Sequence, residues 1–294
     1  MRLPQNPIFI VGYPRSGTTL LQRLLVTQPG LYTFPETHYF CVIEKKIQWA
    51  EDQETIPLGS LPMVYERIYK KMSFYFTAAE IETLDRQAEN KQLSSKALFE
   101  YIVTRFLLNL YPGIVDIPSW RWIEKTPNHA HFLERILCLY PRAQVLHILR
   151  HPVPAIFSRK LKFPFNREIA VTELARRWNR MLDDVDRFKS QNPNHILTLR
   201  YEDLVTQLEN EMKRIGAFLE IAFDIERYSS ISRENPGLPE GIILPSEPWK
   251  LEDLQRELTS TNDDYKTIFS RQDAEAVEAV IGERLKKCGY ESFY

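Results

Sequence analysis

The chain has 294 residues, of which 44% are hydrophobic and 26% charged, and its formal net charge is −1. This length fits one large domain that can bury its own core, and the balance is that of an ordinary globular protein. The near-neutral charge argues against nucleic acid or an anionic membrane as a partner, so any anion site must be built locally. The cysteines, Cys41, Cys138 and Cys288, show no metal-ligand spacing, which favours free thiols in a reducing compartment.

The hydrophobic runs of the chain are short. The first, at residues 8–11, is too short for a signal-peptide core, and no later run reaches the length of a membrane span. We therefore expect a cytoplasmic protein without a membrane span. A trimmed luminal domain would show the same features.

Strand and helix patterns alternate along the chain. Short apolar runs typical of buried strands lie at residues 7–11 and 143–149. Further strands are expected at residues 31–34, 120–124 and 195–200. Helical spacing follows at residues 18–28, 128–139, 153–160, 169–189 and 203–219, with a last helix at 271–287. This order predicts an α/β fold with a doubly wound, mostly parallel sheet, in a single domain over residues 1–294.

Two segments interrupt this alternation. Residues from about 40 to 111 are mostly helical in pattern, and we interpret them as a helical insertion over the active site. Their scattered aromatic residues are equally well explained by core packing; they include Trp49, Tyr65, Tyr69, Phe74 and Phe76. Residues from about 224 to 262 are rich in Pro, Ser and Glu, which predicts an extended late loop.

The first predicted loop joins a strand to a helix. A glycine-containing turn of this kind aims backbone N–H groups at one point, and the helix N-terminus adds partial positive charge, which suits a phosphate or sulfate. The spacing of Gly12 and Gly17 matches the nucleoside-triphosphatase loop, but Thr18 holds the position of its lysine. Arg15 lies inside the loop and can reach an anion from the other side. The loop residues are Tyr13, Pro14, Arg15, Ser16, Gly17, Thr18 and Thr19.

A second basic residue follows the strand predicted at residues 143–149. Arg150 is placed where an open α/β sheet presents ligands, and a guanidinium group binds phosphate with two parallel hydrogen bonds. Ser158 follows within the next predicted helix. Arg150 alone would be explained by a surface salt bridge, but the combination with Ser158 and the first loop favours an anion site.

These two segments resemble motifs of one family. The segment YPRSGTTLLQRLL resembles the 5′-phosphosulfate loop of sulfotransferases that use 3′-phosphoadenosine-5′-phosphosulfate (PAPS), in the version with Arg that is similar to bacterial and tyrosylprotein enzymes. The segment VLHILRHPVPAIFS resembles their 3′-phosphate motif. The resemblance covers residues 8 to about 220. It implies a P-loop-like fold and in-line transfer of a sulfonyl group from PAPS to a hydroxyl acceptor, with 3′,5′-adenosine bisphosphate (PAP) as the product and no metal.

The resemblance also implies catalytic roles. Glu36 resembles the general base of the branch with Arg in the loop, and His38 is the rival, since another branch uses His and an imidazole suits proton transfer near neutral pH. Lys125, in the segment EKTP, resembles a lysine that contacts the bridging oxygen or the sulfonate of the donor. The combination of a base, a cation and in-line positioning is what sulfonyl transfer needs.

Two further segments resemble donor-binding regions. Tyr201, in the segment RYEDL, resembles a tyrosine that reaches the adenine. Trp249 and Lys250 lie in the late loop, where family members carry basic residues that close over the 3′-phosphate. This second match is weaker, because the chain lacks the fuller basic and glycine-containing motif of the cytosolic enzymes.

Other readings of the sequence stay open at this stage. One is a nucleotide-dependent kinase or NTPase, which Thr18 disfavours, and another is a non-catalytic nucleotide-binding module. A metal site is rejected because neither histidine pair, 129/131 or 147/151, has a third ligand at a suitable spacing. The acceptor can be a small molecule, a lipid, a sugar or a peptide hydroxyl, and the oligomeric state is undetermined.

Overall fold

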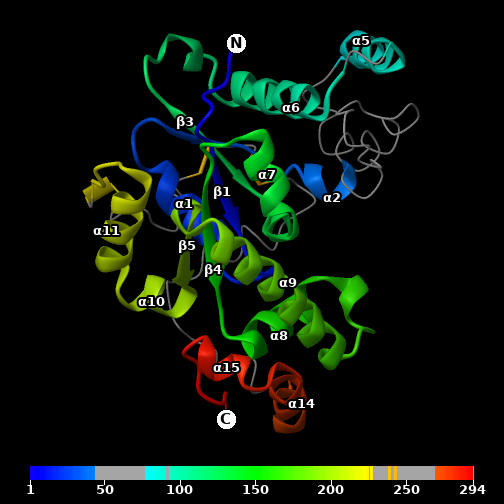
Figure 1. The fold of residues 1–294 in the computed structure, drawn as a ribbon, viewed down its shortest axis with the longest axis vertical. Helices are drawn as coiled ribbons and strands as arrows, with labels where there is room; N and C mark the ends of the chain where they lie inside the picture. Colours follow the sequence, from blue (N-terminus) through cyan, green and yellow to red (C-terminus); the bar gives the residue numbers. More distant parts are fainter. Residues whose placement is uncertain are drawn as a thin grey trace.

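A computed structural model describes residues 1–43, 77–90, 93–224, 226–227, 238–239, 242–243 and 269–293. Its centre is a five-stranded sheet with the order β2-β3-β1-β4-β5, drawn in Figure 1. All neighbouring strands pair in parallel. The prediction of a doubly wound parallel α/β sheet is therefore confirmed. The strands are β1 (Ile8–Val11), β2 (Leu31–Thr33), β3 (Arg121–Lys125), β4 (Gln144–Leu149) and β5 (Ile196–Arg200).

Alternate side chains of the strands supply two cores, one on each face of the sheet, as the strand period of two requires. Phe9 and Trp122 belong to the larger core, whereas Ile8, Ile10 and Ile123 belong to the smaller one. Helices α6 (Ser95–Leu110), α7 (Leu133–Leu139), α8 (Pro152–Lys162), α9 (Val171–Gln191) and α14 (Arg271–Ile281) contribute to the larger core. Helices α1 (Thr18–Val26), α10 (Tyr201–Thr206) and α11 (Leu208–Leu219) contribute to the smaller core. Burial on both faces explains why β1, with the sequence IFIV, and most of β4, with the sequence QVLHIL, are apolar runs in the sequence.

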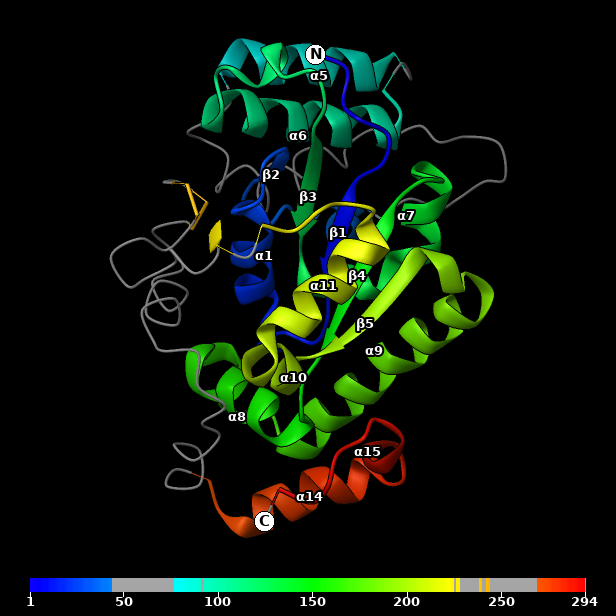
Figure 2. The same ribbon diagram turned by 90° about the vertical axis from the view of Figure 1, so that its left-hand side faces the viewer.

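The helices lie where the sequence predicts them, with local breaks. Figures 1 and 2 place α5 and α6 at one end of the long axis and α14 and α15 at the other. The helices are α1 (Thr18–Val26), α2 (Tyr39–Ile43), α5 (Ala78–Glu89), α6 (Ser95–Leu110), α7 (Leu133–Leu139), α8 (Pro152–Lys162), α9 (Val171–Gln191), α10 (Tyr201–Thr206), α11 (Leu208–Leu219), α14 (Arg271–Ile281) and α15 (Arg284–Lys287). Short 3₁₀ turns, η2 to η5, span Ile114–Asp116, Pro127–Phe132, Pro164–Asn166 and Pro193–His195.

Three predicted helices are interrupted. The helix predicted at 128–139 begins as the 3₁₀ turn η3 and becomes α-helical only from Leu133. The one at 203–219 starts earlier and breaks at Gln207, which has φ −132°. The one at 271–287 breaks at Gly282, which has φ 61°, a conformation that glycine adopts without strain.

The described part of the predicted insertion is helical and belongs to the core. In α6, Phe106 stacks on Phe34 with ring centroids 5.8 Å apart, and Phe99 contacts Trp122. The five aromatic residues named for this segment, and most of the late loop at 224–262, lie outside the described residues. None of the helices in the described part of the chain combines the length and apolar character that a bilayer crossing requires.

Candidate active site

The loop between β1 and α1 contains two glycines in crowded positions. A Cβ on Gly12 would lie 2.4 Å from the carbonyl oxygen of Ile148, and a Cβ on Gly17 would lie 2.4 Å from the ring of Tyr201. Gly17 also has φ 98°, which disfavours any residue with a side chain. The Gly12 N–H donates to the Pro127 carbonyl at 3.2 Å. The loop is therefore held between the ends of β3 and β4.

The same loop can receive an anion. Thr18 and Thr19 open α1, so their N–H groups belong to the unsatisfied first turn of a helix. Ser16 is fully buried, and its hydroxyl makes no hydrogen bond to any described residue. A buried polar group without a partner is expected to meet a ligand or water. Pro14 is half-buried in the loop, and the Tyr13 hydroxyl donates to the Leu174 carbonyl at 3.3 Å.

The two basic motifs meet at this loop. Arg15 Nε donates to Ser158 Oγ at 3.0 Å, and Arg150 Nη1 donates to the Arg15 carbonyl at 3.0 Å. The guanidinium of Arg150 also lies over the ring of Tyr201, 4.4 Å from its centroid. The structure thus brings together four residues that the sequence predicted as donor-binding: Arg15, Arg150, Ser158 and Tyr201.

The candidate catalytic residues lie beside the loop. Lys125 Nζ donates to Glu36 Oε1 and to Thr19 Oγ1, the latter at 3.4 Å. The other oxygen of Glu36 lies 3.2 Å from His38 Nε2. The side chain of Lys125 is only 2% exposed and that of Glu36 only 9%. Two buried charges of opposite sign are thus paired, as burial of an ion demands.

A second buried pair adjoins this one, and it was not among the site residues predicted from the sequence. Glu124 Oε2 lies 2.8 Å from His129 Nδ1, and both side chains are fully buried. Burial raises the pKa of Glu124, but the charge of His129 and the hydrogen bonds from His129, Thr126 and Thr37 together hold that pKa below its ordinary value. Burial likewise lowers the pKa of His129, but the Glu124 carboxylate and the Cys41 thiol together raise it to about 9. The one sequence feature that could have indicated this pair is the position of Glu124 inside a segment predicted to be a strand.

A thiol lies beside this pair. Burial raises the pKa of Cys41, but hydrogen bonding to the His129 and His38 imidazoles lowers it to about 7. Cys41, Cys138 and Cys288 are all free thiols.

The other histidines considered for a metal site have protein partners. His131 pairs with Asp184 at 2.7 Å, and His147 is buried in β4, where burial lowers its pKa to about 3. His151 accepts a hydrogen bond from the Val153 N–H at the start of α8. Among the described residues, no cluster of three or more His, Cys, Asp or Glu side chains could hold a metal ion. Trp249 and Lys250 lie outside the described residues.

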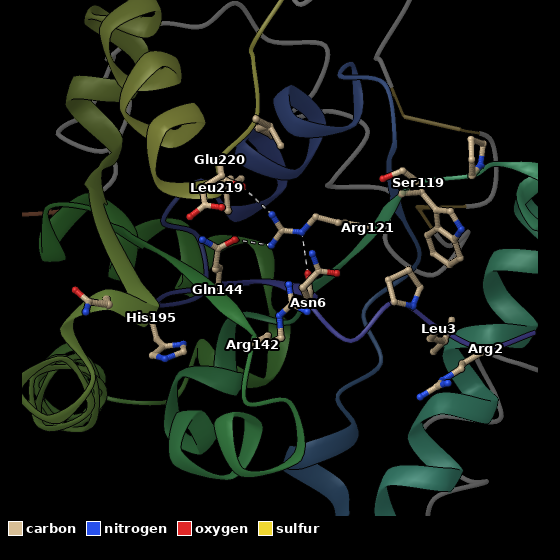
Figure 3. A pocket seen from close by; sticks show the side chains of 15 residues that line it. Arg2, Leu3, Asn6, Ser119, Arg121, Arg142, Gln144, His195, Leu219 and Glu220 are labelled. Carbon is tan, nitrogen blue, oxygen red and sulfur yellow. Dashed lines mark hydrogen bonds between the residues drawn. The ribbon is translucent and has the colours of Figure 1, made fainter.

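A cavity of about 820 Å³ opens at the opposite, amino-terminal edge of the sheet (Figure 3). Arg121 in its wall donates to the carbonyls of Asn6 and Leu219 and to the side chain of Gln144. The bond to Leu219 caps the carboxyl end of α11. Because the guanidinium of Arg121 already donates to these three groups, we do not assign it to an anion site. The cavity contains none of the predicted site residues.

Comparisons with known proteins show one family and one fold. Protein-tyrosine sulfotransferase A of Caenorhabditis elegans is 24% identical over 222 residues, covering 74% of this chain and 50% of the relative. Omega-hydroxy-beta-dihydromenaquinone-9 sulfotransferase of Mycobacterium bovis is 26% identical over 257 residues, covering 76% of this chain and 64% of the relative. The sulfotransferase domain from the curacin biosynthetic pathway has the same fold, with a TM-score of 0.64, 20% identity and 99% coverage of both chains.

The chain spans between 26% and 64% of the length of the curated relatives that it matches. The model of the sulfotransferase family matches residues 7–225, which include β1 to β5 and every described residue of the candidate site. The chain therefore belongs to the sulfotransferase family.

Proposed function

We propose that the protein transfers a sulfonyl group from PAPS to a hydroxyl acceptor. The observation that carries the proposal is the linkage of the two anion motifs, in which Arg15 donates to Ser158 and Arg150 donates to Arg15 across 143 and 135 residues of sequence. A donor with phosphates at both its 5′ and 3′ positions needs two such motifs side by side. Backbone N–H groups and a guanidinium are suitable partners for both.

Each motif has a part in donor binding in this proposal. The loop of residues 13–19 surrounds the 5′-phosphosulfate, and the buried hydroxyl of Ser16 points to a ligand there. Arg150 and Ser158 bind the 3′-phosphate, and Tyr201 packs near the adenine. Trp249 and Lys250 are predicted from the sequence alone to close over the 3′-phosphate.

The chemistry follows from the pair beside the loop. The acceptor oxygen attacks sulfur in line, the bond between sulfur and the 5′-phosphate oxygen breaks, and PAP departs with the electron pair. Glu36 takes the proton of the acceptor hydroxyl, and Lys125 stabilises the negative charge that develops on the phosphate. Because Lys125 contacts both Thr19 and Glu36, it lies between the donor loop and the base.

The acceptor we propose is a tyrosine hydroxyl of a peptide or the hydroxyl of a lipid-like alcohol, the two kinds of acceptor that the names of the relatives indicate. The three free thiols are compatible with a cytoplasmic location. A panel containing a tyrosine peptide, a long-chain primary alcohol and 2-naphthol, each incubated with labelled PAPS, would distinguish these acceptors.

Calorimetry with PAP and AMP tests the donor assignment. Because a charged hydrogen-bonded contact is lost with the 3′-phosphate, we expect PAP to bind about ten- to a hundredfold more tightly than AMP. Arg150→Gln should remove most of that difference, whereas the exposed Arg142→Gln should keep it. Equal affinities for the two nucleotides contradict the proposal, and binding of ATP with Mg²⁺ in preference to PAP favours a kinase. Tight PAP binding without turnover of PAPS favours a binding module.

A further inference from the structure

The segment that carries the candidate base straddles the carboxyl end of β3. Neighbouring residues of a strand point to opposite faces of the sheet, so Glu124 and Lys125 project to different sides. Glu36 contacts Lys125 on one side, and Thr37 contacts Glu124 on the other. Two consecutive residues are thus held by two consecutive residues of the strand.

The contact between Glu124 and Thr37 belongs to a larger network. Glu124 Oε1 accepts hydrogen bonds from the Thr37 hydroxyl at 2.9 Å and from the Thr126 hydroxyl at 2.7 Å. Thr37 Oγ1 in turn accepts from the N–H of Tyr39 at 3.2 Å, and Thr126 Oγ1 accepts from the N–H of His38 at 3.3 Å. Each hydroxyl therefore forms a hydrogen-bonded bridge between the Glu124 carboxylate and the backbone next to Glu36.

This backbone is held in an unfavourable conformation. His38 has φ 52°, a left-handed geometry that a residue with a Cβ seldom adopts, and such a conformation persists only where the surroundings impose it. The bond from the His38 N–H to Thr126 is one such constraint. The packing of Phe40 on the His129 ring, with centroids 4.9 Å apart, is another.

We propose that the buried Glu124–His129 pair positions Glu36 for catalysis by holding residues 36–38 against the end of β3. The proposal rests on the proposed function, and Glu124 and His129 act as positioning residues that do not touch the substrates. A carboxylate is needed because it accepts from two hydroxyls and a ring N–H at once, whereas an amide brings donors of its own. His129 supplies the compensating charge, because its pKa of about 9 keeps it protonated near neutral pH.

The test is Glu124→Gln, read by NMR of the histidine side chains with and without PAP. In the native protein we expect His129 to remain doubly protonated near neutral pH. In the variant His129 loses the Glu124 charge, so the protonated fraction of His129 near neutral pH should fall even though Cys41 still contacts the ring. The His38 signals should move, because His38 Nε2 lies 3.2 Å from Glu36 Oε2 and reports on Glu36. PAP affinity should stay unchanged. With PAPS and 2-naphthol as substrates, kcat should fall about 10- to 100-fold without a matching rise in the KM for PAPS.

Glu211→Gln is the matched control. Glu211 is a buried carboxylate paired at 2.6 Å with the half-exposed Arg214 on α11. Its variant therefore loses the charge of a buried carboxylate and its ion pair, but should leave the signals of His129 and His38 and the value of kcat unchanged. If Glu124→Gln does not fold, Thr37→Val removes the hydroxyl and keeps the ion pair. It should move the His38 signals and leave His129 protonated.

Three results overturn the proposal: a neutral His129 in the native protein, unchanged His38 signals in the variants, or a loss of PAP affinity equal to the loss of kcat. The NMR measurement needs no acceptor. If the native protein neither binds PAP nor turns over PAPS, the proposed function fails, while the spectra still decide whether the pair holds residues 36–38.

Discussion

At the scale of single residues, the part of the candidate site at the end of β3 contains charges that are buried in pairs. Lys125 and Glu36 form one pair, and Glu124 and His129 form the other. An isolated buried charge is expensive, and removal of one member of a buried pair leaves the other uncompensated. Substitutions here should therefore preserve shape, so that a loss of charge is separated from a loss of packing.

Glu36→Gln keeps the shape and removes the base. Because general-base catalysis contributes about 10²–10⁴-fold, kcat should fall by that order while PAP affinity stays nearly unchanged. His38→Asn should have a smaller effect if the ring only contacts Glu36. Steady-state kinetics with calorimetry of PAP measures both. The reverse ranking, with Glu36→Gln near native and His38→Asn folded but inactive, would make His38 the base.

At the scale of elements, the loop between β1 and α1 depends on backbone geometry that no side chain can replace. Gly17 combines a positive φ with the close approach of Tyr201, and Gly12 lies against the end of β4. The conformation of the loop therefore depends directly on the positions of β4 and α10. Its anion-binding geometry exists only when these elements are in place.

Gly17→Ala should damage this element specifically. The left-handed backbone alone costs a residue with a Cβ about 1–3 kcal/mol, and the methyl group would push Tyr201 away from the loop. We expect a lower melting temperature and weaker binding of PAP. Gly113→Ala is the control, because Gly113 has φ −90° and a Cβ there meets nothing within 4 Å. Equal PAP affinity in the two variants would show that the loop tolerates the displacement.

At the scale of the whole molecule, the order and direction of the strands bring the residues of the candidate site together. Residues that follow β1, β2, β3, β4 and β5 all lie at the carboxyl edge of one sheet, because every strand runs in the same direction. Ligands bind at such an edge in open α/β sheets. A donor that contacts several strand ends should therefore stabilise the fold as a whole.

Thermal unfolding measures this linkage. At a PAP concentration 100 times its Kd, the free energy of unfolding should rise by about 2.7 kcal/mol. With an unfolding entropy of about 2.1 cal/mol/K per residue, this corresponds to a rise of about 4–5 °C in the Tm of a 294-residue chain. EDTA should not change the shift, because Thr18 replaces the lysine of the Mg²⁺-dependent loop. Arg150→Gln should reduce it. A shift that needs Mg²⁺ would favour the nucleoside-triphosphatase alternative.

The sequence by itself determined the features whose signals lie in neighbouring residues. Apolar runs predicted the central strands β1 and β4, the alternation with helices predicted a parallel sheet, and the spacing of Gly12, Arg15 and Gly17 predicted the anion loop. The resemblance of two short segments to family motifs predicted Glu36 and Lys125 as catalytic candidates, and the structure places these two side chains in contact. Each of these signals is local, since burial on both faces of a strand or a tight turn constrains the residues at that place alone.

The tertiary structure alone decided which distant side chains meet. The bond from Arg15 to Ser158, the approach of Tyr201 to Gly17 and the Glu124–His129 pair depend on strand order and register. A local sequence pattern does not indicate the strand order or the register. The sequence showed Glu124 only as a charged residue in a predicted strand. Its partners, Thr37 and His129, are defined only by the tertiary structure, in which residues 36–38 cross the end of β3. Pairing of buried charges is a property of the assembled core, which is why only the structure could reveal it.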